Sequence, residues 1–111
     1  MAAEPFCYLT TTGRTSGLPR TIEIWFAMAG RTLYMLAGGG RHSGWVKNLL
    51  QRPEVQVRLA GVDFPGRARV VGEPGEDGLA RRLVLEKYQP TYGGDLTAWG
   101  SASLPVAVDL D

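Results

Sequence analysis

The sequence has almost no disulfide or metal-binding chemistry, because its 111 residues include one cysteine and one histidine. A lone cysteine cannot form an intramolecular disulfide, and Cys7 with His42 cannot supply the ligands of a zinc site. This cysteine usage fits a reducing compartment, and we expect a cytoplasmic protein. Cys7 has no basic sequence neighbour that would activate a thiol, so we expect it to pack as a small buried hydrophobe.

Strong charge and long apolar runs are missing too. The net charge of +1 argues against a dedicated nucleic-acid surface. No apolar stretch approaches the length of a membrane span, and the start, MAAEPFC, lacks the basic and apolar parts of a signal peptide. The hydrophobic content of 44% is enough for one modest core, so we expect a single domain over residues 1–111.

Apolar residues recur at every second position through much of the chain, which predicts β-strands. The segments PRTIEIWFAM (residues 19–28) and EVQVRLA (residues 54–60) show this alternation, and Ala29 with Gly30 is expected to form a hairpin turn. The six expected strands lie at residues 6–12, 19–28, 31–37, 54–60, 62–72 and 104–110.

Two segments have a helical period instead. Residues 43–53 place apolar side chains on one helix face, with Ser43 as the N-cap and Pro53 as the stop signal. Residues 75–88 begin with acidic residues, as helix N-termini favour, and residues 86–99 are expected to form an aromatic-rich loop. Regular strand-helix-strand alternation is absent, so we predict a β-barrel-type α+β fold.

The glycine-rich segment GGGRHSGW, residues 38–45, joins an expected strand to an expected helix. Glycine lets backbone N–H groups turn toward an anion, and a helix N-terminus adds donors. The segment lacks the Gly-Lys pair of a P-loop, and it does not lie in the βαβ unit of a dinucleotide fingerprint. It is either a phosphate cradle or a flexible loop without a ligand.

Several cations lie near two expected loops. The segment TTTGRTSGLPR (residues 10–20) carries Arg14 and Arg20, and three more cations follow in or after the glycine-rich segment: Arg41, Lys47 and Arg52. If the loops are neighbours, these charges would meet on one small anionic ligand. Scattered surface arginines are the alternative.

Aromatic residues are the other candidates for ligand contacts: Trp25, Trp45, Tyr88, Tyr92 and Trp99. They could line a flat ligand, although a dimer seam or core filling would use tryptophan equally well. A hydrolase triad is poorly supported, because no G-x-S-x-G segment accompanies the single histidine.

With these segments in place, the chain resembles the deazaflavin (F420)-dependent nitroreductase family of actinobacteria, within the larger FMN-binding split β-barrel group. The motifs that carry the resemblance are LTTTGRTSGLPR (residues 9–20), GGGRHSGWVKNLLQRPEVQVRL (residues 38–59), and YQPTYGGDLTAW (residues 88–99) followed by LPVAV. The resemblance implies an α+β, mainly β fold: a six-stranded antiparallel split β-barrel with two or three short helices. It also implies an F420H2-dependent reductase that transfers a hydride from the coenzyme to a quinone, nitroaromatic or similar small conjugated acceptor.

The resemblance assigns coenzyme F420, whose tail is anionic, to the following residues: Arg14, Thr15, Ser16, Gly17, Arg20, Trp25, Gly38, Gly39, Gly40, Arg41, Gly44 and Trp45. Tyr88 and Tyr92 match tyrosines that border the substrate side. No catalytic residue is assigned, since a tyrosine or a bound water could deliver the proton that accompanies the hydride.

Two positions depart from the family pattern. Thr15 stands where the family often has a lysine, which removes one cation from the tail site. Residues 1–5 replace a longer N-terminal helical segment, so we expect a more open pocket or one covered by the partner in a homodimer. Two alternatives stay open: a protein of the same fold that binds FMN or a haem-type ligand, and a non-catalytic module that binds the deazaflavin or a lipid.

Overall fold

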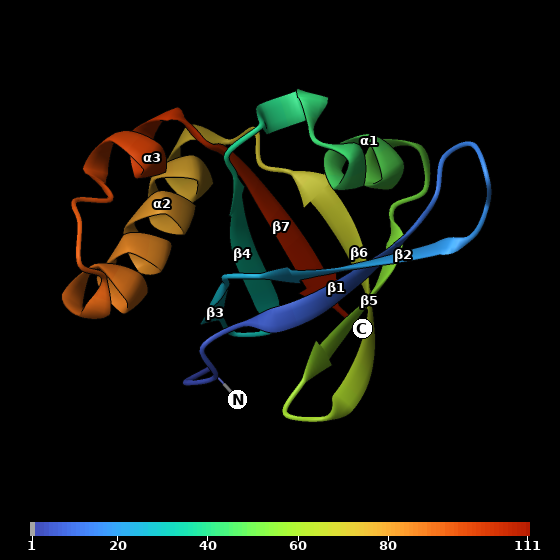
Figure 1. The fold of residues 1–111 in the computed structure, drawn as a ribbon, viewed down its shortest axis with the longest axis horizontal. Helices are drawn as coiled ribbons and strands as arrows, with labels where there is room; N and C mark the ends of the chain where they lie inside the picture. The colour runs from blue at the N-terminus through green and yellow to red at the C-terminus, as the bar shows by residue number, and fades with distance from the viewer. Residues whose placement is uncertain (1) are drawn as a thin grey trace.

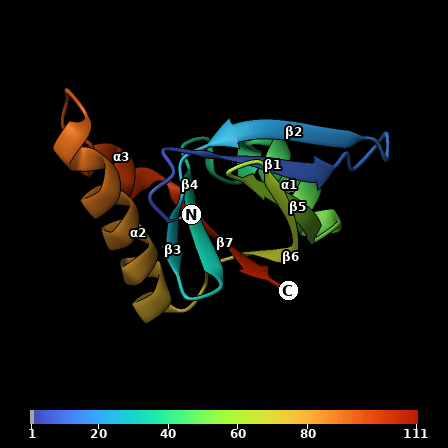
Figure 2. The same cartoon turned by 90° about the horizontal axis from the view of Figure 1, so that it is seen from below.

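The computed structural model describes residues 2–111 and contains one curled antiparallel sheet with the strand order β2-β1-β5-β6-β7-β4-β3 (Figures 1 and 2). The strands are β1 Cys7–Thr12, β2 Pro19–Ile24, β3 Ala27–Ala29, β4 Thr32–Ala37, β5 Glu54–Leu59, β6 Val62–Val70 and β7 Leu104–Leu110. The helices are η1 Gly40–His42, α1 Gly44–Gln51, α2 Pro74–Tyr88, η2 Gln89–Thr91 and α3 Thr97–Ala102. The predicted α+β, split-barrel-like class is confirmed.

The expected number of six strands was too low, because the expected strand over residues 19–28 is two strands. β2 pairs with β1 at one edge of the sheet, and β3 pairs with β4 at the other edge. The ladder is interrupted at Trp25 and Phe26. The Phe26 backbone N–H donates to Tyr88 Oη at 3.0 Å, and its carbonyl accepts from Lys87 Nζ at 2.9 Å. Side chains of α2 thus replace the strand partner, while the apolar alternation runs on through the break.

The main core lies inside the curl of the sheet. Alternate residues of β1 and β5 point into it, and α1 covers one end of the curl with Val46 and Leu49 (Figure 1). β4 is buried on both faces, since Leu33 and Met35 face this core while Tyr34 and Leu36 pack toward α2. This explains why TLYMLA is a continuous apolar run rather than an alternating one.

The segment expected to be an aromatic-rich loop is more ordered than predicted, because it contains η2 and α3. The side chain of Gln89 organises the turn between them, donating to the Gly94 carbonyl and accepting from the Leu96 N–H, each at 2.7 Å. α3 packs beside α2 on the outside of the sheet (Figure 2). Within residues 2–111, no helix has the length and apolar character needed to cross a bilayer.

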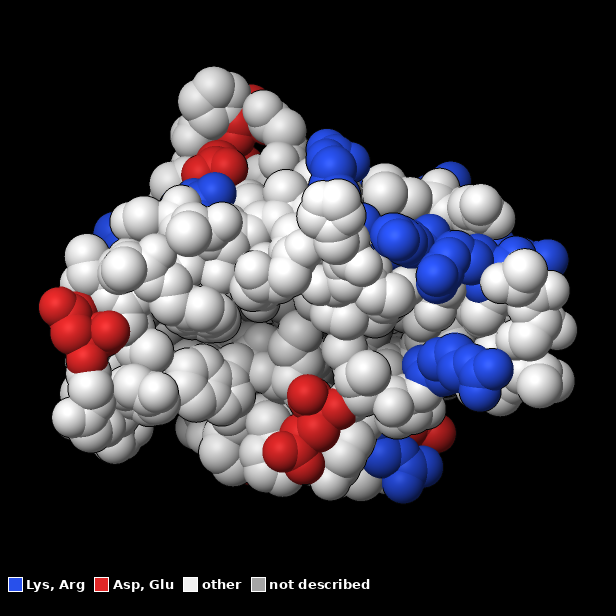
Figure 3. Space-filling model, turned by 45° about the horizontal axis from the view of Figure 1, so that its top comes forward, with Lys and Arg blue, Asp and Glu red and all other residues white. Residues whose placement is uncertain are grey.

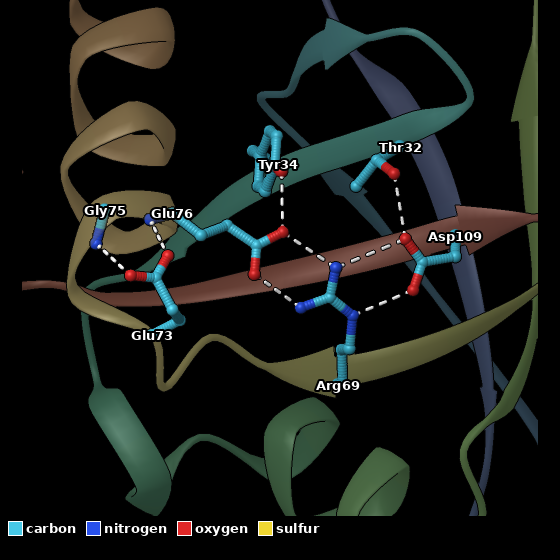
Figure 4. Close-up of polar contacts among 7 residues, drawn as sticks. All are labelled: Thr32, Tyr34, Arg69, Glu73, Gly75, Glu76 and Asp109. Atoms are coloured by element: carbon cyan, nitrogen blue, oxygen red, sulfur yellow. Dashed lines mark hydrogen bonds and ion pairs between the residues drawn. The ribbon is translucent and has the colours of Figure 1, made fainter.

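An ion network fixes the N-terminal end of α2 on the sheet (Figure 4). Arg69 of β6 bonds both carboxylate oxygens of Glu76 in α2, at 2.6 and 2.8 Å, and also bonds Asp109 of β7 at 2.8 Å. Tyr34 donates to Glu76 at 2.7 Å, and Thr32 donates to Asp109 at 2.8 Å. The Arg69 guanidinium lowers the pKa of both carboxyl groups, while burial and the bond to Glu76 raise the pKa of Tyr34 to about 12.

Candidate functional site

The β1–β2 turn lies directly against the start of α1. Arg14 Nη1 donates to the Gly44 carbonyl at 3.3 Å and to Asn48 Oδ1 at 2.9 Å, and its backbone N–H donates to the same Oδ1 at 3.1 Å. The turn is closed by a bond from the Gly13 N–H to the Leu18 carbonyl at 2.8 Å. The two segments that the sequence singled out are therefore side by side.

Asn48 joins the turn to the core, and the sequence interpretation missed it. Only 5% of its surface is exposed, and its Nδ2 donates to Thr11 Oγ1 of β1 at 3.1 Å. Both of its polar groups are thus satisfied inside the protein. The sequence signal that could have identified Asn48 is its polar side chain on the apolar stripe of the helix, between Val46 and Leu49.

The cations of the two segments are exposed and unneutralised. Within residues 2–111, none of them forms an ion pair, whereas the five arginines at positions 58, 67, 69, 81 and 82 each pair with a carboxylate. The unpaired set is Arg14, Arg20, Arg41, Lys47 and Arg52. Figure 3 shows Lys and Arg side chains gathered toward the side of the molecule where α1 and the β1–β2 turn lie. An anion placed there meets positive charge without displacing a carboxylate.

The glycine loop before α1 is tightly folded. Gly40 has a φ of 59°, which favours glycine, and a Cβ on Gly39 would lie 2.5 Å from Ser43 Oγ. Ser43 is the N-cap of α1, as predicted, but its side chain accepts no capping hydrogen bond. The first N–H groups of α1 therefore keep their capacity to bind an acceptor.

Four aromatic side chains form one cluster beside this loop. The Trp25 ring stacks on Tyr88 with a centroid distance of 4.3 Å and an interplanar angle of 5°. The Tyr92 and Trp99 rings meet Trp25 edge-on, at 5.7 and 5.8 Å. Trp99 reaches the glycine loop, because a Cβ on Gly38 would lie 3.3 Å from its Nε1.

The other candidate residues lie outside this cluster. Trp45, at the start of α1, is half-buried and packs against the main core. Thr15, Ser16 and Gly17 form the exposed tip of the β1–β2 turn, where Ser16 Oγ accepts from the Leu18 N–H at 3.2 Å. The candidates thus fall into a cationic half and an aromatic half, which meet where Gly38 faces Trp99.

The hydroxyl group of Tyr88 is already engaged. It accepts from the Phe26 N–H at 3.0 Å and lies 2.8 Å from the Pro5 carbonyl, to which it can donate. Burial raises the pKa of this hydroxyl. Tyr88 therefore contributes its ring face to the cluster, while its polar end holds the chain together.

Arg81 fixes the position of α3 and so of Trp99. Its Nη1 donates to three carbonyl groups at the end of α3, those of Gly100, Ser101 and Ser103, at 2.7, 3.0 and 2.7 Å. Asp77 holds the same guanidinium at 2.6 Å. The last carbonyls of a helix have no partner within it, so this arginine anchors α3 to α2.

Several solved structures share the fold of this chain. A solved F420H2-dependent reductase, FDR-A, is 23% identical with a TM-score of 0.76, over 97% of this chain and 95% of that chain. A protein described as a domain-swapped dimer is 24% identical with a TM-score of 0.77, over 95% of this chain and 80% of that chain. A conserved hypothetical protein from Mycobacterium tuberculosis is 20% identical with a TM-score of 0.75, over 94% of this chain and 71% of that chain.

These likenesses establish the shared fold. The model of the F420H2-dependent quinone reductase family matches residues 1–111, the full length of the sequence. The chain belongs to the F420H2-dependent quinone reductase family.

Proposed function

We propose that a single domain over residues 1–111 binds reduced coenzyme F420 and reduces a quinone, a nitroaromatic or a similar small conjugated acceptor. The observation that carries the proposal is the set of unpaired cations beside the glycine loop and the first turn of α1. Family membership supplies the coenzyme and the reaction type.

The residues fit the coenzyme. Its anionic tail matches Arg14, Arg20 and Arg41, together with the hydroxyl and amide groups of Thr15, Ser16 and Gly17. We assign the flat deazaflavin ring to Gly38, Gly39, Gly40, Gly44, Trp25 and Trp45, since an aromatic ring system packs well on backbone and on other rings. When bound, the coenzyme supplies a hydride. The protein then has to hold the two reactants together and keep water out of their contact.

The acceptor side is assigned to Tyr88 and Tyr92. The engaged hydroxyl of Tyr88 favours a role for its ring rather than for its proton. Tyr92 is 48% exposed, so its hydroxyl can exchange protons with solvent water.

Location and assembly belong to the same proposal. We propose a cytoplasmic protein, for which the free thiol of Cys7 is suitable, since burial raises its pKa to about 12 and makes it unreactive. A homodimer is supported by the similar fold described as a domain-swapped dimer. The family resemblance points to an actinobacterial source.

Replacing Arg14 by Ala tests the proposed tail site. We expect coenzyme F420 to bind more weakly by about 1–3 kcal/mol, because a charge-assisted contact is lost. Fluorescence titration of the coenzyme measures this directly. Arg41→Ala is a second variant, since Arg41 is exposed and makes no described side-chain bond, and Arg67→Ala is the control at a paired, exposed position. Unchanged affinity in both test variants would move the tail elsewhere.

A further inference from the structure

A cavity of about 430 Å³ lies between the C-terminal end of α2 and the N-terminal segment of the chain. Its walls include the aromatic rings of Phe6, Trp25, Tyr88 and Tyr92. Small-molecule sites typically enclose about 300–1,000 Å³, so the cavity has the size of a ligand site. Aromatic walls of this kind favour a flat ring as the occupant.

The walls are held in place by contacts between distant segments. Trp25 and Tyr88 support each other by stacking, and the Tyr88 hydroxyl lies 2.8 Å from the Pro5 carbonyl, which fixes the N-terminal segment beside α2. Tyr92 is half-exposed, and its ring is perpendicular to that of Trp25. The cavity is therefore formed before any ligand arrives.

One charged group, Lys87 of α2, also lines this cavity. Its Nζ donates to the Phe26 carbonyl at 2.9 Å and lies 3.6 Å from the centre of the Phe26 ring. An ammonium group has three N–H donors, and this hydrogen bond uses one of them. No carboxylate within residues 2–111 forms an ion pair with Lys87. Partial burial lowers its pKa, which the more distant Glu4 partly offsets.

The cavity adjoins the proposed coenzyme site through one side chain. Trp25 lines the cavity and also meets Trp99, which lies against Gly38 of the glycine loop. Trp25 is thus common to the cavity lining and to the residues proposed for the deazaflavin ring.

We infer that this cavity binds the acceptor and that Lys87 selects flat aromatic acceptors carrying an acidic group, such as a quinone bearing a sulfonate or a carboxylate. The inference rests on the proposed reductase function. An anionic substituent supplies the direct ion-pair partner that Lys87 does not have within residues 2–111, while the ring lies against the aromatic walls. Lys87 is a specificity-determining residue in this scheme, and the hydride still comes from the coenzyme.

The test compares 1,4-naphthoquinone-2-sulfonate with the neutral 2-methyl-1,4-naphthoquinone in the oxidation of reduced coenzyme F420. Lys87→Gln removes the charge and keeps an N–H donor for the Phe26 carbonyl, which also lies 3.1 Å from Tyr88 Oη. The control Arg82→Gln removes one exposed positive charge from the same helix. We expect KM for the sulfonate to rise about tenfold in Lys87→Gln, with KM for the neutral quinone changed little. The ratio of the two KM values cancels intrinsic differences in quinone reactivity.

A second measurement needs no turnover. Calorimetry with naphthalene-2-sulfonate, a redox-inert planar anion, should show binding to the wild type and to Arg82→Gln, and about tenfold weaker binding to Lys87→Gln. Equal effects of the two substitutions, or a wild type that does not favour the anion, would overturn the inference. If the anion binds through Lys87 but no quinone oxidises the coenzyme, the cavity is still a binding site for planar anions, and the proposed reductase function is wrong.

Discussion

At the scale of single residues, Asn48 connects three parts of the molecule through one side-chain amide. Replacing it by Ala would leave Thr11 Oγ1 and the Arg14 N–H without their partner inside the protein. We expect the free energy of unfolding to fall by about 1–3 kcal/mol, because buried polar groups lose their hydrogen bonds. Urea denaturation measures this change, with Gln51→Ala at the exposed end of α1 as the control. Equal stability of the two variants would contradict the bridging role.

Tyr88 gives a second prediction at this scale. Tyr88→Phe keeps the stack with Trp25 and removes the acceptor of the buried Phe26 N–H. We expect a loss of about 1–3 kcal/mol in stability, measured by denaturation, with turnover of the folded protein largely kept. Tyr92→Phe is the matched control, since Tyr92 is half-exposed. If Tyr88→Phe were as stable as the wild type yet inactive, the hydroxyl would be the proton donor after all.

The sequence singled out some of these residues as functional candidates and missed others. Arg14 stood out because a bare turn needs no arginine, and the aromatics stood out by type. Asn48 and Lys87 did not, because their roles depend on partners 37 and 61 residues away along the chain. Periodicity describes which face a residue occupies, but it does not describe what lies opposite that face.

At the scale of elements, the Arg69 network predicts how acid loosens α2. Glu76 and Asp109 have lowered pKa values in the folded protein, mainly because of Arg69, so they stabilise the fold at a pH above about 4, the usual carboxyl range. This contribution is lost as the pH falls through the pKa values that the two carboxyl groups have in the folded protein. In Arg69→Met the carboxyl pKa values should return toward their ordinary range.

We therefore expect the wild type to exceed Arg69→Met in stability at pH 6 and the gap to shrink below about pH 4, as measured by urea midpoints across pH. Arg67→Met is the control, because its ion pair with Glu54 is well exposed and should contribute little at any pH. A gap that stayed constant with pH would show that Arg69 acts through packing alone.

Some strands and helices could be predicted from the sequence, and others could not. The alternation of β1 and β5 and the helical period of α1 follow from local sequence, and those elements lie close to the expected ranges. The break at Trp25 and Phe26 could not be predicted, because the apolar alternation continues through it and the interruption comes from Tyr88 and Lys87. α3 escaped prediction for a similar reason, since Arg81 and Gln89 stabilise it from outside its own sequence.

At the scale of the whole molecule, ligand binding should be visible as thermal stability. A ligand that binds only the folded state stabilises it by about 2.7 kcal/mol at 100 times its Kd. We expect coenzyme F420 to raise Tm in a concentration-dependent way and FMN at equal concentration to raise it much less. Differential scanning fluorimetry of the chain with each ligand makes the comparison. An equal rise with FMN would favour the flavin-binding alternative.

The short link between β2 and β3 has one more consequence. These strands are the two free edges of the sheet, yet only Trp25 and Phe26 separate them along the chain. Since successive Cα atoms lie about 3.8 Å apart, the edges can separate by at most about 11 Å at that end. The two edges can then separate only by pivoting about Trp25 and Phe26, so that motion there reaches the proposed coenzyme site and the proposed acceptor cavity together.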